Sequence, residues 1–126
     1  MSPLIALALL STALLLFVAQ LAVGRARGKY GIKAPATTGH PDFERAFRAQ
    51  MNTVEGAVMF VPVLLVAGAF GNASWAAIFG GAWVLGRVLY LFGYLHSAKA
   101  RAPGFFIAMA AWALLVLSGA SAWAAD

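Results

Sequence analysis

The chain has 126 residues, of which 63% are hydrophobic and 10% are charged, and its mean hydropathy is +0.84. A soluble domain carries roughly 25% charged residues, so this composition excludes one and indicates an integral membrane protein. The chain contains no cysteine, which excludes disulfides, thiolate metal sites and a thiol nucleophile supplied by the protein itself.

Four apolar stretches predict four membrane-spanning helices in a single domain, residues 1–126. Each stretch approaches or exceeds the roughly 20 residues that cross a bilayer. The first is interpreted as a retained helix, because no basic residue precedes it and it is longer than the apolar core of a signal peptide. We therefore expect an all-α bundle whose spans are Pro3 to Val23, Val54 to Phe70, Trp75 to Leu95 and Pro103 to Ala124.

Local signals predict where these helices begin and end. Ser2 followed by Pro3 is typical of a helix start, and Gly24 with the basic residues after it is expected to end the first span. Asp42 is expected to cap the second helix. The two histidines, His40 and His96, are interpreted as solvated loop residues.

The net charge of +5 is placed asymmetrically. The amino terminus, the short second connection and the carboxyl terminus contain no Lys or Arg. The positive-inside bias therefore predicts that both basic connections are cytoplasmic and both termini lie on the opposite side, and it argues against a nucleic-acid partner. The basic residues in the first and third connections or the adjoining helix ends are Arg25, Arg27, Lys29, Lys33, Arg45, Arg48, Lys99 and Arg101.

Two polar stripes mark the cytoplasmic ends of the second and third helices. In the second helix, steps of three and four residues put four side chains on one face, within about 80° of each other. Such a stripe inside lipid indicates a site, because an unpaired ionisable group there costs several kcal/mol. The topology puts both stripes at the same depth, where they can face one pocket. The first stripe is Arg45, Arg48, Asn52 and Glu55, and the second is Arg87, Tyr90, Tyr94, Ser97 and Arg101 if the third helix continues that far.

The combination ERxxRAQxNxxE followed by RxxYxxxYxxSxxxR resembles the MAPEG family of membrane glutathione transferases and leukotriene C synthases. The resemblance covers roughly residues 25–112. It implies a homotrimer of four-helix subunits, with a glutathione site at each subunit boundary near the cytoplasmic surface. It also implies an enzyme that conjugates glutathione, as co-substrate and without a metal, to lipophilic electrophiles in the membrane lipid, with peroxidase activity as a further expectation.

The resemblance assigns roles to individual residues. Arg101 matches the arginine that holds the glutathione sulfur as thiolate, and Trp112 matches a tryptophan that lines the lipid-substrate groove. Two departures weaken any claim to leukotriene synthesis, because Gly56 replaces an aromatic residue and Gly28 replaces a second arginine. The expected glutathione contacts are Arg27, Arg48, Gln50, Asn52, Glu55, Tyr90 and Tyr94.

These residue types suit glutathione, which carries two carboxylates, an ammonium and a thiol. Arginines can make charge-assisted bonds to the carboxylates, and Glu55 can accept the ammonium. A guanidinium beside the thiol favours the thiolate, which at neutral pH is otherwise a few per cent of the population.

Other interpretations remain open. Arg101 can be a positive-inside anchor, Tyr90 and Tyr94 can belong to an interfacial aromatic belt, and Arg87 can form a buried ion pair with Glu55. A non-catalytic lipid-binding or scaffold member of the same family would keep the fold without the chemistry. A small multidrug exporter is disfavoured because the first span contains no ionisable residue.

Overall fold

The computed structural model describes residues 1–125, and side chains through residue 121. Its long elements are all α-helices, α1 (Pro3–Tyr30), α2 (Pro41–Phe70), α3 (Ala73–His96) and α4 (Ala102–Ala125), and the described residues contain no strand. A single turn of 3₁₀ helix, η1 (Lys99–Arg101), connects α3 to α4. The predicted all-α class and the four predicted spans are confirmed.

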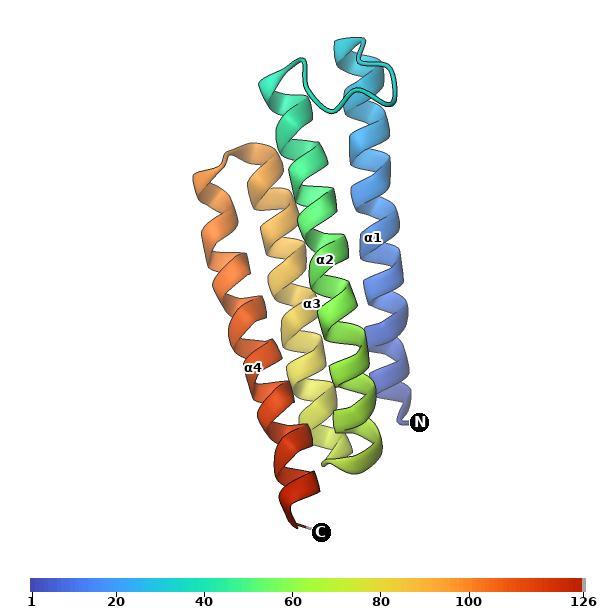
Figure 1. Ribbon diagram of the computed structural model, residues 1–126, viewed down its shortest axis with the longest axis vertical. Helices are drawn as coiled ribbons and strands as arrows, with labels where there is room; N and C mark the ends of the chain where they lie inside the picture. The colour runs from blue at the N-terminus through green and yellow to red at the C-terminus, as the bar shows by residue number, and fades with distance from the viewer. Residues whose placement is uncertain (126) are drawn as a thin grey trace.

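The helices run alternately up and down, as Figure 1 shows. Both termini lie at one end of the bundle, and the α1–α2 and α3–α4 connections lie at the other. Helices α2 and α3 each pack against all the other helices, whereas α1 and α4 are not in contact within the described residues. The polar ends of α2 and α3 are therefore neighbours in the middle of the bundle.

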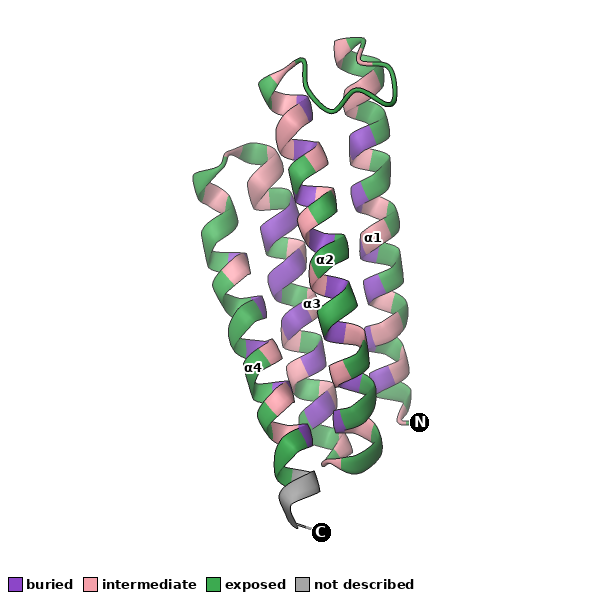
Figure 2. Cartoon of the chain, in the orientation of Figure 1, coloured by how far each residue is buried: buried purple, intermediate pink, exposed green. Residues whose placement is uncertain are grey.

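The helices carry buried positions along the faces that pack together, shown in purple in Figure 2, and many large apolar side chains are exposed on the outside. Phe60 and Trp83 stack in the core with ring centroids 3.8 Å apart. On the outside, Leu10 is 70% exposed, Val58 69% and Phe106 67%. All four long helices are long and apolar enough to cross a membrane. An apolar exterior of this kind suits lipid rather than water.

The start of α1 agrees with prediction, and the two helix ends at the first connection do not. The Ser2 hydroxyl accepts a hydrogen bond from the Leu4 backbone N–H at 3.3 Å. Helix α1 continues past Gly24 to Tyr30 and ends at Gly31, whose positive φ of 66° supplies the left-handed cap that favours glycine. Basic side chains are good helix formers, so the charged run extends the helix beyond its apolar part.

The predicted cap of α2 by Asp42 is wrong. Helix α2 begins at Pro41, and His40 caps it, with the imidazole Nδ1 accepting from the Asp42 backbone N–H at 3.1 Å. The His40 ring also stacks on Tyr30 at 3.8 Å between centroids, so His40 is partly buried rather than a solvated loop residue. Asp42 instead accepts a hydrogen bond from the Tyr30 hydroxyl at 2.7 Å and pairs with Arg45.

The end of α3 also differs from prediction. The helix stops at His96, so Ser97 and Arg101 do not continue its face. Ser97 accepts a hydrogen bond from the Ala100 backbone N–H through its hydroxyl, which stabilises the turn into η1. Pro103 and Gly104 both lie inside the first turn of α4, which begins at Ala102.

A glycine contact holds α3 and α4 close together at this level. A Cβ added to Gly104 would overlap the Tyr90 backbone nitrogen and the Gly86 carbonyl oxygen. A Cβ on Gly86 would lie 2.7 Å from the Ala108 backbone nitrogen. Small residues permit such close backbone approach between membrane helices. The contact fixes the start of α4 against Tyr90, next to the polar stripe of α3.

Candidate functional site

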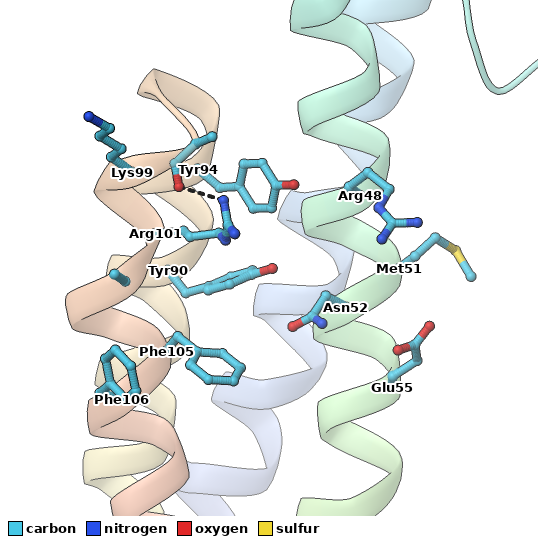
Figure 3. Close-up of a pocket in the computed structure, with 12 residues that line it drawn as sticks. Arg48, Met51, Asn52, Glu55, Tyr90, Tyr94, Lys99, Arg101, Phe105 and Phe106 are labelled. Carbon is cyan, nitrogen blue, oxygen red and sulfur yellow. Dashed lines mark hydrogen bonds between the residues drawn. The ribbon is translucent and has the colours of Figure 1, made fainter.

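A pocket of about 770 Å³ opens between α2 and the α3–η1–α4 connection. Figure 3 shows its polar side chains approaching from these two sides. Its volume falls within the roughly 300–1,000 Å³ of small-molecule sites. The residues that line it are Arg48, Met51, Asn52, Glu55, Tyr90, Tyr94, Ala98, Lys99, Arg101, Ala102, Phe105 and Phe106.

Helix α2 supplies one wall through its helical repeat. Arg48, Asn52 and Glu55 are separated by four and three residues, which places them one above another on one face. Arg48 and Glu55 are exposed, whereas Asn52 is half-buried against α3. Three residues of the predicted α2 stripe therefore face a cavity, with a cation at its outer end and a carboxylate deeper along the helix, whereas Arg45 pairs with Asp42 and does not line the cavity.

The opposite wall consists of Tyr90 and Tyr94 on α3 together with Arg101 from η1. The two tyrosine rings meet edge to face with centroids 5.6 Å apart. The Arg101 guanidinium lies 5.0 Å from the Tyr94 ring centroid and donates to the Ala98 carbonyl oxygen at 2.7 Å. Thus Arg101 reaches the pocket although the helix that was expected to carry it ends five residues earlier.

The pocket combines charge with an apolar edge. Three of its lining residues, Arg48, Lys99 and Arg101, are cations, and Glu55 is the only carboxylate among them. Phe105 and Phe106, at the start of α4, form the apolar edge. The described residues contain no group of three or more His, Asp or Glu side chains that could hold a metal ion. The cavity suits an anionic small molecule that also carries one positive group.

Arg87 lies behind this cavity and does not pair with Glu55. Its Nη2 donates to Asn52 Oδ1 at 3.0 Å and to Thr53 Oγ1 at 2.9 Å. Within the described part of the chain the one ion pair is Arg45–Asp42. The interpretation of Arg87 as an ion-pair partner of Glu55 is therefore wrong, because α2 presents Asn52 and Thr53 to α3 and turns Glu55 outward.

Three expected contacts do not line this pocket. Arg27, in the last turn of α1, donates to the Ala36 carbonyl oxygen at 2.8 Å and lies over the Phe43 ring of α2. Gln50 lies on another face of α2. Trp112 donates through its indole nitrogen to the Met59 carbonyl oxygen at 3.0 Å, so it connects α4 to α2.

The sequence motifs missed Met51, Lys99, Phe105 and Phe106. The phenylalanines follow the connection and belong to an apolar run, so their pattern does not differ from that of lipid-facing residues. The sequence predicts Lys99 only as a residue of the basic connection. The signal that could have found them is their distance from Arg101, two residues for Lys99 and four and five for the phenylalanines, because a 3₁₀ turn leading directly into a helix keeps such neighbours near one another.

Comparison with protein families supplies an independent finding. The model of the MAPEG family matches residues 5–121, which is nearly the whole chain and includes every element that builds the pocket. This chain belongs to the MAPEG family. The resemblance inferred from the two motifs is confirmed, and the chain is an integral, multi-pass membrane protein.

Proteins similar in sequence to this MAPEG chain include some that are named as enzymes. It is 46% identical to microsomal glutathione S-transferase 2 of Homo sapiens over 100 residues, which are 79% of this chain and 68% of the relative. It is 41% identical to leukotriene C4 synthase of Cavia porcellus over 117 residues, 88% of this chain and 78% of the relative. An uncharacterized protein of Synechocystis is 45% identical over 95 residues, 75% and 69% of the two chains.

Proposed function

We propose that this protein is a membrane-bound glutathione transferase that conjugates the glutathione thiolate to lipophilic electrophiles. The observation that carries the proposal is that one pocket gathers side chains from two polar stripes, distant in sequence, on a MAPEG fold. The names of the transferase and synthase relatives support the same activity. The pocket residues assigned here to glutathione are Arg48, Asn52, Glu55, Tyr90, Tyr94 and Arg101.

The charges of the pocket match those of the tripeptide. Arg48 binds a carboxylate through charge-assisted hydrogen bonds, and Glu55 binds the ammonium. Asn52 and the tyrosine hydroxyls complete the hydrogen bonds of the peptide groups. An unliganded Glu55 on a spanning helix would be costly in lipid, so the ligand's ammonium also satisfies this carboxylate.

Arg101 is the proposed catalytic residue. Its guanidinium lies among the pocket side chains and favours the anionic form of the bound thiol, whose proton passes to water. The thiolate sulfur then forms a bond to an electrophilic carbon. For an epoxide, the carbon–oxygen bond breaks and the oxygen takes a proton from water. The step needs no metal and no oxidant, and its acceleration comes from positioning and charge stabilisation.

The lipophilic substrate reaches the sulfur from the bilayer. Phe105 and Phe106 form the pocket's apolar edge at the start of α4, and Phe106 is 67% exposed to the lipid side of the chain. An apolar electrophile dissolved in the membrane can therefore approach Arg101 without crossing water. Trp112, two helical turns further along α4, extends this apolar face and is proposed to line the same path.

We also propose a homotrimer with a glutathione site at each subunit boundary. The pocket is open in the single chain, with Arg48 and Glu55 exposed on the outward face of α2. Gln50 and Arg27, which do not line the pocket of their own chain, would contribute to the site from across the boundary. A neighbouring copy would also cover charged groups that otherwise face lipid.

The orientation follows from charge. The two connections that lie together at one end of the bundle carry the basic residues, and we propose that this end is cytoplasmic. The glutathione pocket opens near that end, so the ligand would enter from the cytoplasm.

A conjugation assay tests the proposed activity. Detergent-purified protein is incubated with glutathione and an activated chloronitro aromatic, and the thioether product is followed by its absorbance. We expect enzyme-dependent product that is lost in Arg101→Ala and kept in Arg25→Ala, an exposed arginine outside the pocket. Glutathione binding without product from any electrophile class would instead support a non-catalytic member of the family.

A further inference from the structure

Arg87 is a buried charge without an anionic partner. Its side chain is 3% exposed, and no carboxylate of the described residues bonds to it. Its Nε has no hydrogen-bond partner there either. Buried arginines that serve packing alone are normally paired with acidic groups. The placement of this guanidinium therefore needs another explanation.

The two hydrogen bonds of Arg87 Nη2 have a defined direction. Nη2 carries two hydrogens, and Asn52 Oδ1 and Thr53 Oγ1 take one each, at 3.0 and 2.9 Å. The Thr53 hydroxyl donates its own hydrogen to the Ala49 carbonyl oxygen at 2.7 Å, so toward Arg87 it can only accept. Thr53 is completely buried, and this bond holds the guanidinium in one place.

This arrangement dictates the orientation of the Asn52 amide. A guanidinium can only donate, so the amide end that meets Arg87 must be the oxygen. The nitrogen, Nδ2, is then the other end of the amide, and it bonds to no group of the described residues. Asn52 lines the pocket, as Figure 3 shows. Its two N–H donors are therefore available to a ligand.

A second contact fixes the position of Arg87 relative to the pocket. The guanidinium carbon lies 4.0 Å from the Tyr90 ring centroid, and Tyr90 is itself a buried pocket residue. The face of the guanidinium packs on Tyr90 of the same helix, α3. Its Nη2 bonds to Asn52 and Thr53 of α2. Arg87 thus couples the two walls of the cavity from behind.

We propose that Arg87 is a positioning residue that fixes Asn52 as a hydrogen-bond donor toward an anionic or carbonyl oxygen of the bound thiol peptide. This inference rests on the proposed function, since it names how that site recognises its ligand. Arg87 does not touch the ligand itself and acts through Asn52. The specificity that results is for an acceptor group at this point of the pocket.

A double-mutant cycle tests the proposal with glutathione as the probe, by titration calorimetry on the full-length protein in detergent. Arg87→Met keeps an apolar contact with the Tyr90 ring and removes the donor. We expect Arg87→Met and Asn52→Ala each to weaken binding about tenfold, the cost of one hydrogen bond to a charged group. The double variant should be about as weak as Asn52→Ala alone, because Arg87 acts through Asn52. Ser118→Ala, which removes a hydroxyl beside Gly71 and away from the pocket, is the control, and its affinity should change less than about threefold.

Asn52→Asp gives a second test that does not depend on whether Arg87→Met folds. Aspartate has the same shape, pairs with Arg87 and should fold at least as stably, but it turns an acceptor oxygen toward the ligand's acceptor. We expect the KM for glutathione to rise more than about tenfold with little change in kcat. A purely structural role for Arg87 would lower the melting temperature of Arg87→Met and leave the KM of that variant for glutathione unchanged.

The outcomes separate the two proposals. Wild-type protein that does not bind glutathione would overturn the proposed function. The positioning role would be overturned, and the proposed function left standing, by either of two results with wild-type protein that binds glutathione. In the first, the losses of affinity from Arg87→Met and Asn52→Ala multiply in the double variant. In the second, Asn52→Asp binds glutathione normally.

Discussion

Two arginines near the pocket, Arg87 and Arg101, have opposite surroundings. Arg87 is buried and both hydrogens of its Nη2 are bonded to α2, whereas Arg101 is exposed in the pocket and bonds only to the Ala98 carbonyl oxygen of its own turn. The first is suited to holding other side chains in place. The second retains donors for a ligand, which is why the two residues receive different roles.

Arg101→Ala tests the catalytic assignment at the scale of one residue. Removing the guanidinium removes the charge that favours the thiolate, so the pKa of the bound glutathione thiol should rise toward its free value of about 8.5. We expect binding to persist and the thiolate absorbance at neutral pH to be mostly lost, as measured by ultraviolet difference spectra across a pH series. Arg25→Ala serves as the matched control. An unchanged thiolate signal would remove Arg101 from this role.

Glu55→Gln tests recognition of the ligand's ammonium. Glu55 is the only carboxylate that lines the pocket, so the neutral amide should lose about 1.5–3 kcal/mol of binding, or roughly 10- to 100-fold in Kd. Calorimetry with glutathione measures the loss. Glu44→Gln, at the first connection away from the pocket, should bind normally. Equal affinities of Glu55→Gln and wild type would contradict the assignment.

At the scale of the helices, the sequence predicted the long apolar segments and both polar stripes, because hydropathy and helical spacing are local properties. It failed at the ends. The cap of α2 depends on the stack of His40 against Tyr30, a contact between helices. The path of Arg101 into the pocket depends on the 3₁₀ turn after Ser97. The first is a contact between separate segments and the second is a local turn, and helical spacing encodes neither.

The partners of Arg87 could not be read from the sequence for the same reason. Asn52, Thr53 and Glu55 are close in sequence, and any of them could meet α3 after a small rotation of α2. The packing of Phe60 on Trp83 and of Thr53 in the core fixes that rotation. An ion pair with Glu55 would be a stronger interaction than the bonds to Asn52 and Thr53, but the packing of α2 against α3 turns Glu55 away from Arg87.

Gly104→Ala tests the glycine contact between α3 and α4. The added methyl would overlap the Tyr90 and Gly86 backbones, which cannot yield as a flexible side chain can. Overpacking of this kind typically costs about 1–3 kcal/mol, and here it also displaces Tyr90 from the pocket. We expect a lower melting temperature in detergent and weaker glutathione binding. Gly81→Ala is the control, because its Cβ would meet nothing within 4 Å. A Gly104→Ala protein with wild-type stability and binding would show that the helices separate freely.

At the scale of the whole molecule, a single copy leaves a charged pocket open on its side. Native mass spectrometry of protein released from detergent should show three copies, since the proposed boundary covers the outward face of α2. Glutathione should increase the fraction of trimer if the ligand bridges two copies. A monomer that binds glutathione and turns over would contradict the shared site.

The absence of cysteine makes the orientation measurable. Single cysteines introduced at Lys33 and at Asn72, which lie in connections at opposite ends of the bundle, can be labelled with a membrane-impermeant maleimide in intact cells. We expect labelling of Asn72→Cys alone, because the basic connection should be cytoplasmic. Labelling of Lys33→Cys alone would reverse the proposed orientation.

The central claim is that the cavity between α2 and the α3–α4 connection binds glutathione, and calorimetric titration of the purified protein tests it most directly. We expect saturable binding by wild-type protein, and binding at least about tenfold weaker in Arg48→Ala, which loses a charge-assisted contact to a carboxylate. Folded wild-type protein that shows no saturable heat with glutathione, or an Arg48→Ala variant that binds as wild type does, would contradict this account of the pocket.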